Sequence, residues 1–250
     1  MTIWVAIVLG LVQGLTEFLP VSSSGHLILF QELFGVANDG LLFEIMLHVA
    51  TLAAIVIVFR KKIWELIKKP FQPMVYYLVI ATAITCAMFL LLGSFVDFKS
   101  VRILPFMFLI TAIILFLTTL IKPKEREVGY TTSVVAGFAQ GIALIPGISR
   151  SGSTIAASLY TGVKRESAAE FAFLMSIPAI LASLVYTVID SPSSVLALEF
   201  WPLLFGFITA LVSGIFAIKV MLRIIKNVKL YWFSIYLVIL SIVLMFVFYI

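Results

Sequence analysis

Two serine- and glycine-rich segments interrupt the long apolar stretches of this chain, and a single offset relates them. The first reads VSSSGHL after Pro20, and the second reads PGISRSGST over residues 146–154. A Pro-Gly pair ends a helix, and a serine just after it is a typical N-cap of the next helix. An offset of 127 residues carries the polar residues of the first segment onto the second: Gln13, Gly14, Ser22, Ser24 and Gly25 fall on Gln140, Gly141, Ser149, Ser151 and Gly152.

The apolar stretches around these segments indicate an all-α integral membrane protein. The chain is 63% hydrophobic and 12% charged, with a mean hydropathy of +1.21, which no soluble domain of this size approaches. The first half contains three predicted transmembrane helices, at 41–59, 74–92 and 103–121. The same offset places three more at 168–186, 201–219 and 230–248, all strongly apolar.

The offset predicts a single membrane domain built from two repeats, over about residues 1–121 and 128–250. Each repeat would contain a re-entrant broken helix pair and three transmembrane helices. Broken backbone at membrane depth is tolerated only where protein or a cavity surrounds it. Because three is odd, the second repeat would start on the opposite side, so we expect inverted repeats, as in many secondary transporters.

The basic residues predict the orientation of the chain. Fourteen lysines and arginines fall in loops expected on one side, and only Lys99 and Arg102 fall on the other. By the positive-inside rule the basic loops are cytoplasmic, so both termini should face outward. We also expect the active site to face the external side, although the basic residues alone leave open which side the site opens to. Clustering at span ends accounts for the net charge of +5 without nucleic-acid binding. The N-terminus lacks a basic region, and we expect no cleavable signal peptide. The single cysteine, Cys86, excludes an internal disulfide and is expected to be packed.

The two broken elements predict an anion site. Helices starting at Ser22 and Ser149 would direct free N–H groups and positive dipole ends towards a shared ligand. Arg150 can add a bidentate contact to phosphate, and an ionisable side chain within hydrocarbon generally marks a functional site.

The repeats differ where chemistry would require it. Glu17 aligns with Leu144, Ser23 with Arg150, and His26 with Ser153. Ser23 and His26 lie three residues apart on one helical face, which allows a nucleophile beside a base, and Glu17 could orient that base or hold a metal. His48 has no clear partner in the sequence, so we expect it to line a pocket or the core rather than act in catalysis.

These motifs resemble the family of undecaprenyl-diphosphatase, the integral-membrane enzyme also called bacitracin resistance protein, over the whole chain. The segment QGLTEFLPVSSSGH matches the family's Glu/Gln-x-x-x-Glu motif at Gln13 and Glu17, and its serine-histidine segment. The PGxSRSxxT motif is matched in full at residues 146–154. The resemblance implies hydrolysis of undecaprenyl diphosphate to undecaprenyl phosphate and phosphate in the bacterial cytoplasmic membrane. That reaction recycles the lipid carrier for cell-wall synthesis, and bacitracin would be linked only through the shared substrate.

The resemblance also implies roles for individual residues. The catalytic residues would be Glu17, Ser23, His26 and Arg150, with Ser23 attacking the terminal phosphorus and His26 as acid or base. Attack by water or by His26 stays open. A divalent cation, Mg²⁺ or Ca²⁺, would lie near Glu17 and Gln13, although the neutral Gln13 weakens a site built from two carboxylates. The residues expected to bind the diphosphate are Gln13, Ser22, Ser24, Gly147, Ser149, Ser151, Gly152 and Thr154.

A lipid-phosphate flippase or an anion transporter is the main alternative, because inverted repeats with broken helices are also a transporter design. The asymmetry of the two elements favours chemistry, since a carrier needs no serine-histidine-carboxylate set. The sequence leaves open whether the protein forms a homodimer, whether flipping accompanies hydrolysis, and which chain length is preferred.

The orientation can be tested by labelling. With Cys86 replaced, single cysteines at Lys68 and Asp39 should react with an impermeant thiol reagent from opposite sides of the membrane, Asp39 from outside. Equal labelling of both positions from outside would contradict the inverted repeats.

Overall fold

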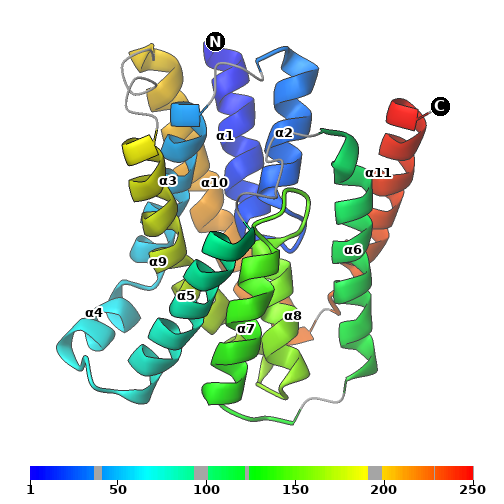
Figure 1. The fold of residues 1–250 in the computed structure, drawn as a ribbon. Helices are drawn as coiled ribbons and strands as arrows, with labels where there is room; N and C mark the ends of the chain where they lie inside the picture. Colours follow the sequence, from blue (N-terminus) through cyan, green and yellow to red (C-terminus); the bar gives the residue numbers. More distant parts are fainter. Residues whose placement is uncertain (37–40, 93–100, 122–123, 191–198, 228, 250) are drawn as a thin grey trace.

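The computed structural model of this protein describes residues 1–36, 41–92, 101–121, 124–190, 199–227 and 229–249. Within these ranges the fold is helical, and the β-structure is an isolated bridge between Arg126 and Val163. Most helices run roughly along one direction and form a bundle (Figure 1). The predicted all-α class is therefore confirmed.

Two broken helix pairs enter the bundle. Helix α1 (Ile3–Phe18) is followed by α2 (Ser23–Phe34), and α7 (Tyr130–Ile142) is followed by α8 (Arg150–Tyr160). Figure 1 shows that the α1–α2 pair reaches the middle from the end that carries the N-terminus, whereas α7–α8 reaches it from the opposite end. The predicted breaks at Pro20 and at the Pro-Gly pair are confirmed, and each pair has its turn inside the bundle.

The six predicted spans are present as helices whose ends differ from the predicted ends by a few residues, except in α10. Five described helices are long and apolar enough to cross a membrane, or six if α3 and its bent neighbour α4 count as one span. Helix α10 continues to Asn227 rather than ending at residue 219, carrying Lys219 and Arg223 within it. The spans are α3 (Leu41–Val58), α5 (Pro73–Leu92), α6 (Leu104–Leu117) between the short helices η2 (Val101–Ile103) and η3 (Thr118–Leu120), α9 (Arg165–Asp190), α10 (Phe200–Asn227) and α11 (Tyr231–Tyr249).

The first basic loop contains a helix that the sequence analysis did not anticipate, α4 (Arg60–Lys68). It bends 79° away from α3 and leaves Trp64 and Ile67 exposed. The Lys68 ammonium lies 5.2 Å from the centre of the Trp64 ring. Apolar and basic side chains on a short exposed helix are typical of a helix in the membrane interface.

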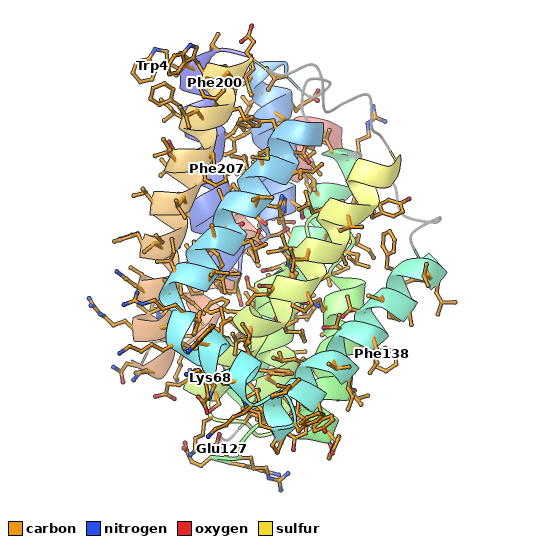
Figure 2. The ribbon with its side chains drawn as sticks, turned by 90° about the vertical axis from the view of Figure 1, so that its left-hand side faces the viewer. Trp4, Lys68, Glu127, Phe138, Phe200 and Phe207 are labelled. Carbon is orange, nitrogen blue, oxygen red and sulfur yellow. The ribbon has the colours of Figure 1, made fainter. Side chains whose placement is uncertain are left out.

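The two ends of the bundle differ in composition. Figure 2 shows Trp4 and Phe200 at one end, and Lys68 and Glu127 at the other. Both termini lie at the end away from α4 (Figure 1). This separation agrees with the expected distribution of basic loops, while the side of the membrane stays a prediction. The predicted polar link at Asn38 and Asp39 and the loop with Asp97 and Lys99 lie outside the described residues.

Small residues allow α1 to pack closely on α10. A Cβ added to Gly10 would lie 2.4 Å from the Gly206 carbonyl oxygen, and one on Gly14 would lie 2.5 Å from the Ala210 carbonyl oxygen. Glycines 127 residues later bring α7 close to α5: an added Cβ would lie 2.8 Å from the Ala81 carbonyl oxygen at Gly137 and 2.4 Å from the Met88 Cβ at Gly141. Such backbone contacts drive helix association where lipid removes the hydrophobic difference. The division into two repeats stays a prediction, and this correspondence supports it.

The α1–α10 contact yields a stability prediction. Gly10→Val should lower the free energy of unfolding in detergent by roughly 1–3 kcal/mol, because the new side chain has no space against Gly206. Gly129→Ala is the control, since nothing lies within 4 Å of an added Cβ there. Thermal unfolding of the two purified variants makes the comparison, and equal melting temperatures would contradict the packing argument.

Candidate active site

The tips of the two broken pairs have matching local structure. Ser22 caps α2 by accepting a hydrogen bond from the Gly25 N–H at 3.3 Å, and Ser149 caps α8 by accepting one from the Gly152 N–H at 3.0 Å. Both predicted N-caps are confirmed. Ser22 itself has φ of 72°, a left-handed conformation that is uncommon for residues other than glycine.

The tips touch each other inside the bundle. A Cβ on Gly25 would lie 3.0 Å from the Gly147 Cα, and one on Gly152 would lie 3.1 Å from the Pro20 Cβ. Gly147 has φ of 91°, which a side chain would strain. The N-termini of α2 and α8 therefore meet, and residues at both face one cavity.

Glu17 connects the two tips electrostatically. It accepts hydrogen bonds from Ser23 Oγ at 2.6 Å and from Gln13 Nε2 at 3.0 Å, both at Oε2. Its other oxygen, Oε1, forms a partly buried ion pair with the guanidinium of Arg150. The Glu17 side chain is 3% exposed and that of Arg150 is 23% exposed. A carboxylate, a hydroxyl and a guanidinium thus meet within hydrogen-bonding distance, and the pairing of Arg150 with Glu17 is a contact that the sequence analysis did not predict.

Among the described residues, the hydrogen bonds of His26 do not go to Ser23, so the expected nucleophile–base hydrogen bond is not formed in this structure and a catalytic role for His26 stays a prediction. Its Nδ1 lies 2.7 Å from the Ser22 carbonyl oxygen, and its Nε2 lies 2.7 Å from the Tyr236 hydroxyl of α11. The Tyr236 ring also stacks on the imidazole, with centroids 5.8 Å apart. A shared helical face was not sufficient, because the Ser23 hydroxyl turns towards Glu17. His26 instead supports the strained backbone at Ser22.

A cavity of about 320 Å³ lies beside this cluster. Ser23, Ser24 and Arg150 line it at the tips, and His48 lines it from α3. His48 Nε2 lies 3.9 Å from Glu17 Oε2. No partner for His48 was clear from the sequence, and the structure places it next to Glu17. Cys86, expected to be packed, is exposed and also lines the cavity.

The remaining predicted diphosphate ligands lie behind the cavity wall. The hydroxyl of Thr154 donates to the Arg150 carbonyl oxygen at 2.8 Å, and that of Ser151 donates to the Leu19 carbonyl oxygen at 3.1 Å. Thr111 of α6, which the motifs gave no reason to select, accepts from the Ser149 N–H at 3.1 Å. These groups hold the tips in place, and a role in phosphate contact stays a prediction for them. The tip residues absent from the cavity lining are Gln13, Ser22, Gly147, Ser149, Ser151, Gly152 and Thr154.

The expected divalent-cation site does not fit the donor set. Both oxygens of Glu17 already accept hydrogen bonds, and the Arg150 guanidinium occupies the position a cation would take. Gln13 Oε1 is buried without a partner, which offers one neutral ligand. Among the described residues no group of three or more histidine, cysteine or acidic side chains could hold a metal.

The fold and the site define an all-helical membrane protein. Where two helix N-termini meet, a serine is hydrogen-bonded to a carboxylate that forms an ion pair with an arginine. The sequence model described as Bacitracin resistance protein BacA matches residues 6–243, so the chain belongs to this family. Its curated relatives include Undecaprenyl-diphosphatase of Treponema denticola, 42% identical over 95% of this chain and 94% of the relative. Those of Carboxydothermus hydrogenoformans and Halothermothrix orenii are 42% and 40% identical, each over at least 94% of both chains. The resemblance found in the motifs is confirmed.

The contacts of His26 predict a structural effect for its partner. Tyr236→Phe removes the hydroxyl beside Nε2 and should lower the free energy of unfolding by about 1 kcal/mol. Tyr249→Phe is a matched control on the same helix, since its hydroxyl donates to the exposed Arg102 carbonyl oxygen. Thermal melts in detergent compare the two. A Tyr236→Phe protein as stable as wild type would show that this hydrogen bond does not support the tip.

Proposed function

We propose that this protein hydrolyses undecaprenyl diphosphate to undecaprenyl phosphate and inorganic phosphate. The observation that carries the proposal is the Ser23–Glu17–Arg150 cluster, which lies at two helix N-termini beside a cavity. The relatives named Undecaprenyl-diphosphatase, matched over nearly their whole length, support the same substrate. A transporter needs no hydroxyl held by a carboxylate, so the cluster favours hydrolysis.

The diphosphate is bound by charge. Arg150 and the N-terminal dipoles of α2 and α8 face the cavity, and all three attract an anion. In the structure the Arg150 guanidinium is ion-paired with the Glu17 carboxylate. A diphosphate carries more negative charge than one carboxylate and competes for Arg150. Its binding weakens the Glu17–Arg150 pair and makes Glu17 a better proton acceptor.

The first chemical step is attack by Ser23. Its Oγ forms a bond to the terminal phosphorus, and its proton passes to Glu17 Oε2, to which it is already hydrogen-bonded at 2.6 Å. The bond from that phosphorus to the bridging oxygen breaks, and polyprenyl phosphate leaves with the electron pair. Arg150 neutralises the charge that develops on the transferred group. Water then hydrolyses the phosphoserine, which releases phosphate and restores the hydroxyl.

The polyprenyl chain leaves the cavity between α5 and α9. The lining includes Cys86 and Tyr186, which are exposed on the surface of membrane-spanning helices. The rings of Phe89 on α5 and Tyr186 on α9 make an edge-to-face contact, with their centroids 5.1 Å apart. An apolar chain passing this rim stays in lipid while its headgroup reaches Arg150.

We also propose that this protein crosses the bacterial cytoplasmic membrane several times, with inverted repeats and a cavity that opens outward. All groups invoked come from one chain, so the proposal requires no second copy. Removing the diphosphate that bacitracin recognises would confer resistance only indirectly, through the shared substrate.

Phosphate release from undecaprenyl diphosphate by purified protein tests the function. Wild type should release phosphate, and Ser23→Ala should bind the lipid without releasing it. Parallel reactions with a chelator decide whether a cation is required. A wild-type protein that releases no phosphate, yet moves the lipid across vesicles, would establish the flippase instead.

The role of Arg150 predicts a separation between turnover and affinity. Arg150→Lys keeps the charge but loses the planar fork that bridges two phosphate oxygens. We expect kcat to fall by roughly a hundredfold or more, with a smaller change in KM. Steady-state kinetics measure both on the same preparation, and near-wild-type kcat with lower thermal stability would make Arg150 a structural residue.

A further inference from the structure

His48 is the imidazole that faces the cavity containing Ser23 and Arg150. Its Nδ1 lies 2.8 Å from the backbone carbonyl oxygen of Glu44. A carbonyl oxygen can only accept, so Nδ1 carries a hydrogen in either protonation state. In the neutral ring, Nε2 is therefore an unprotonated acceptor. The side chain is 29% exposed, which gives small molecules in the cavity access to it.

The partner of Nε2 is not at hydrogen-bonding distance. Nε2 lies 3.9 Å from Glu17 Oε2, and in the neutral ring both atoms are acceptors. Two polar atoms at this separation leave room for a bridging water. One water molecule can donate to both atoms, because each is within about 2.8 Å of a position beside the gap. Glu17 Oε2 also accepts from Ser23 at 2.6 Å, so a water in that position would lie next to the nucleophile.

We propose that His48 is a catalytic base for the second half of the reaction, holding and deprotonating the water that hydrolyses the Ser23 phosphoester. The proposal rests on the phosphatase function above. The water oxygen bonds to phosphorus, and one water proton passes to His48 Nε2. The bond between phosphorus and Ser23 Oγ breaks, and Oγ regains its proton from Glu17. Phosphate leaves, and His48 later releases its proton to solvent, so atoms and charges balance.

His26, the histidine of the serine motif, is less suited to this task. Both of its ring nitrogens are engaged, with the Ser22 carbonyl oxygen and with Tyr236, and it does not line the cavity. The two histidines thus have different roles. His26 supports the backbone before Ser23, and His48 accepts the proton of the attacking water.

Trapping the covalent intermediate tests the assignment. Purified wild type, His48→Ala and His48→Gln receive polyprenyl diphosphate labelled on the terminal phosphorus and are quenched in acid. In both variants steady-state phosphate release should fall by about a hundredfold or more, the scale of a lost general base. Labelled phosphoserine should accumulate to about one per chain, with a burst of polyprenyl phosphate. Added imidazole should restore release in His48→Ala, because the cavity has room for it.

Three controls accompany this experiment. Thr209→Val should behave as wild type, since Thr209 of α10 is not part of the cavity lining and its hydroxyl donates to the Phe205 carbonyl oxygen at 2.7 Å. The double variant Ser23→Ala/His48→Ala should carry no label. A circular-dichroism melt confirms that each variant is folded, and His48→Gln preserves more of the side-chain volume.

Two results would overturn the proposal: wild-type release by the His48 variants, or loss of the burst together with release. The second would place His48 in binding or in the first step. Absence of phosphate release from wild type would instead remove the phosphatase function itself, so the two failures are distinguishable.

Discussion

The ion pair between Glu17 and Arg150 is the interaction on which the rest of the site depends. It joins residues 133 positions apart, one on each broken helix pair, within a bundle whose surroundings are largely apolar. Either charge alone would be costly to bury, and removing one partner of such a pair typically costs about 3–5 kcal/mol. The pair therefore fixes how the two tips meet, and it keeps Arg150 near the cavity before substrate arrives.

The second constraint is that backbone N–H and C=O groups inside the membrane need hydrogen-bond partners. A helix that breaks inside a membrane protein exposes N–H groups, and each must find a partner. Ser22 and Ser149 satisfy one N–H of each tip as caps, and Thr111 accepts the N–H of Ser149. The N–H groups at the two helix starts then provide a positive environment for an anion. The same broken helix ends therefore need caps for their N–H groups and also attract phosphate.

Much of this arrangement could be predicted from the sequence, for reasons that are local or periodic. The length of the apolar stretches predicted the spans, and Pro20 and the Pro-Gly pair predicted the helix breaks. The positions of the serines predicted the N-caps. The roles of His48, Tyr236 and Thr111 could not be foreseen, because each depends on contact between helices remote in sequence. The contact of His26 with Tyr236 could not be foreseen for the same reason: residue spacing gave the helical face of His26, but not the helix that packs opposite that face. The helix α4 was missed because its basic residues were interpreted only as a loop signal.

The most direct test of this account is a double-mutant cycle on the ion pair. Glu17→Gln, Arg150→Met and the double variant would be unfolded in detergent, and their free energies of unfolding compared with wild type. Because each single change leaves a buried charge unpaired, we expect the double variant to lose less stability than the two singles together. The coupling should exceed about 1 kcal/mol. Additive losses, agreeing within about 0.5 kcal/mol, would show that the tips are not held by this pair.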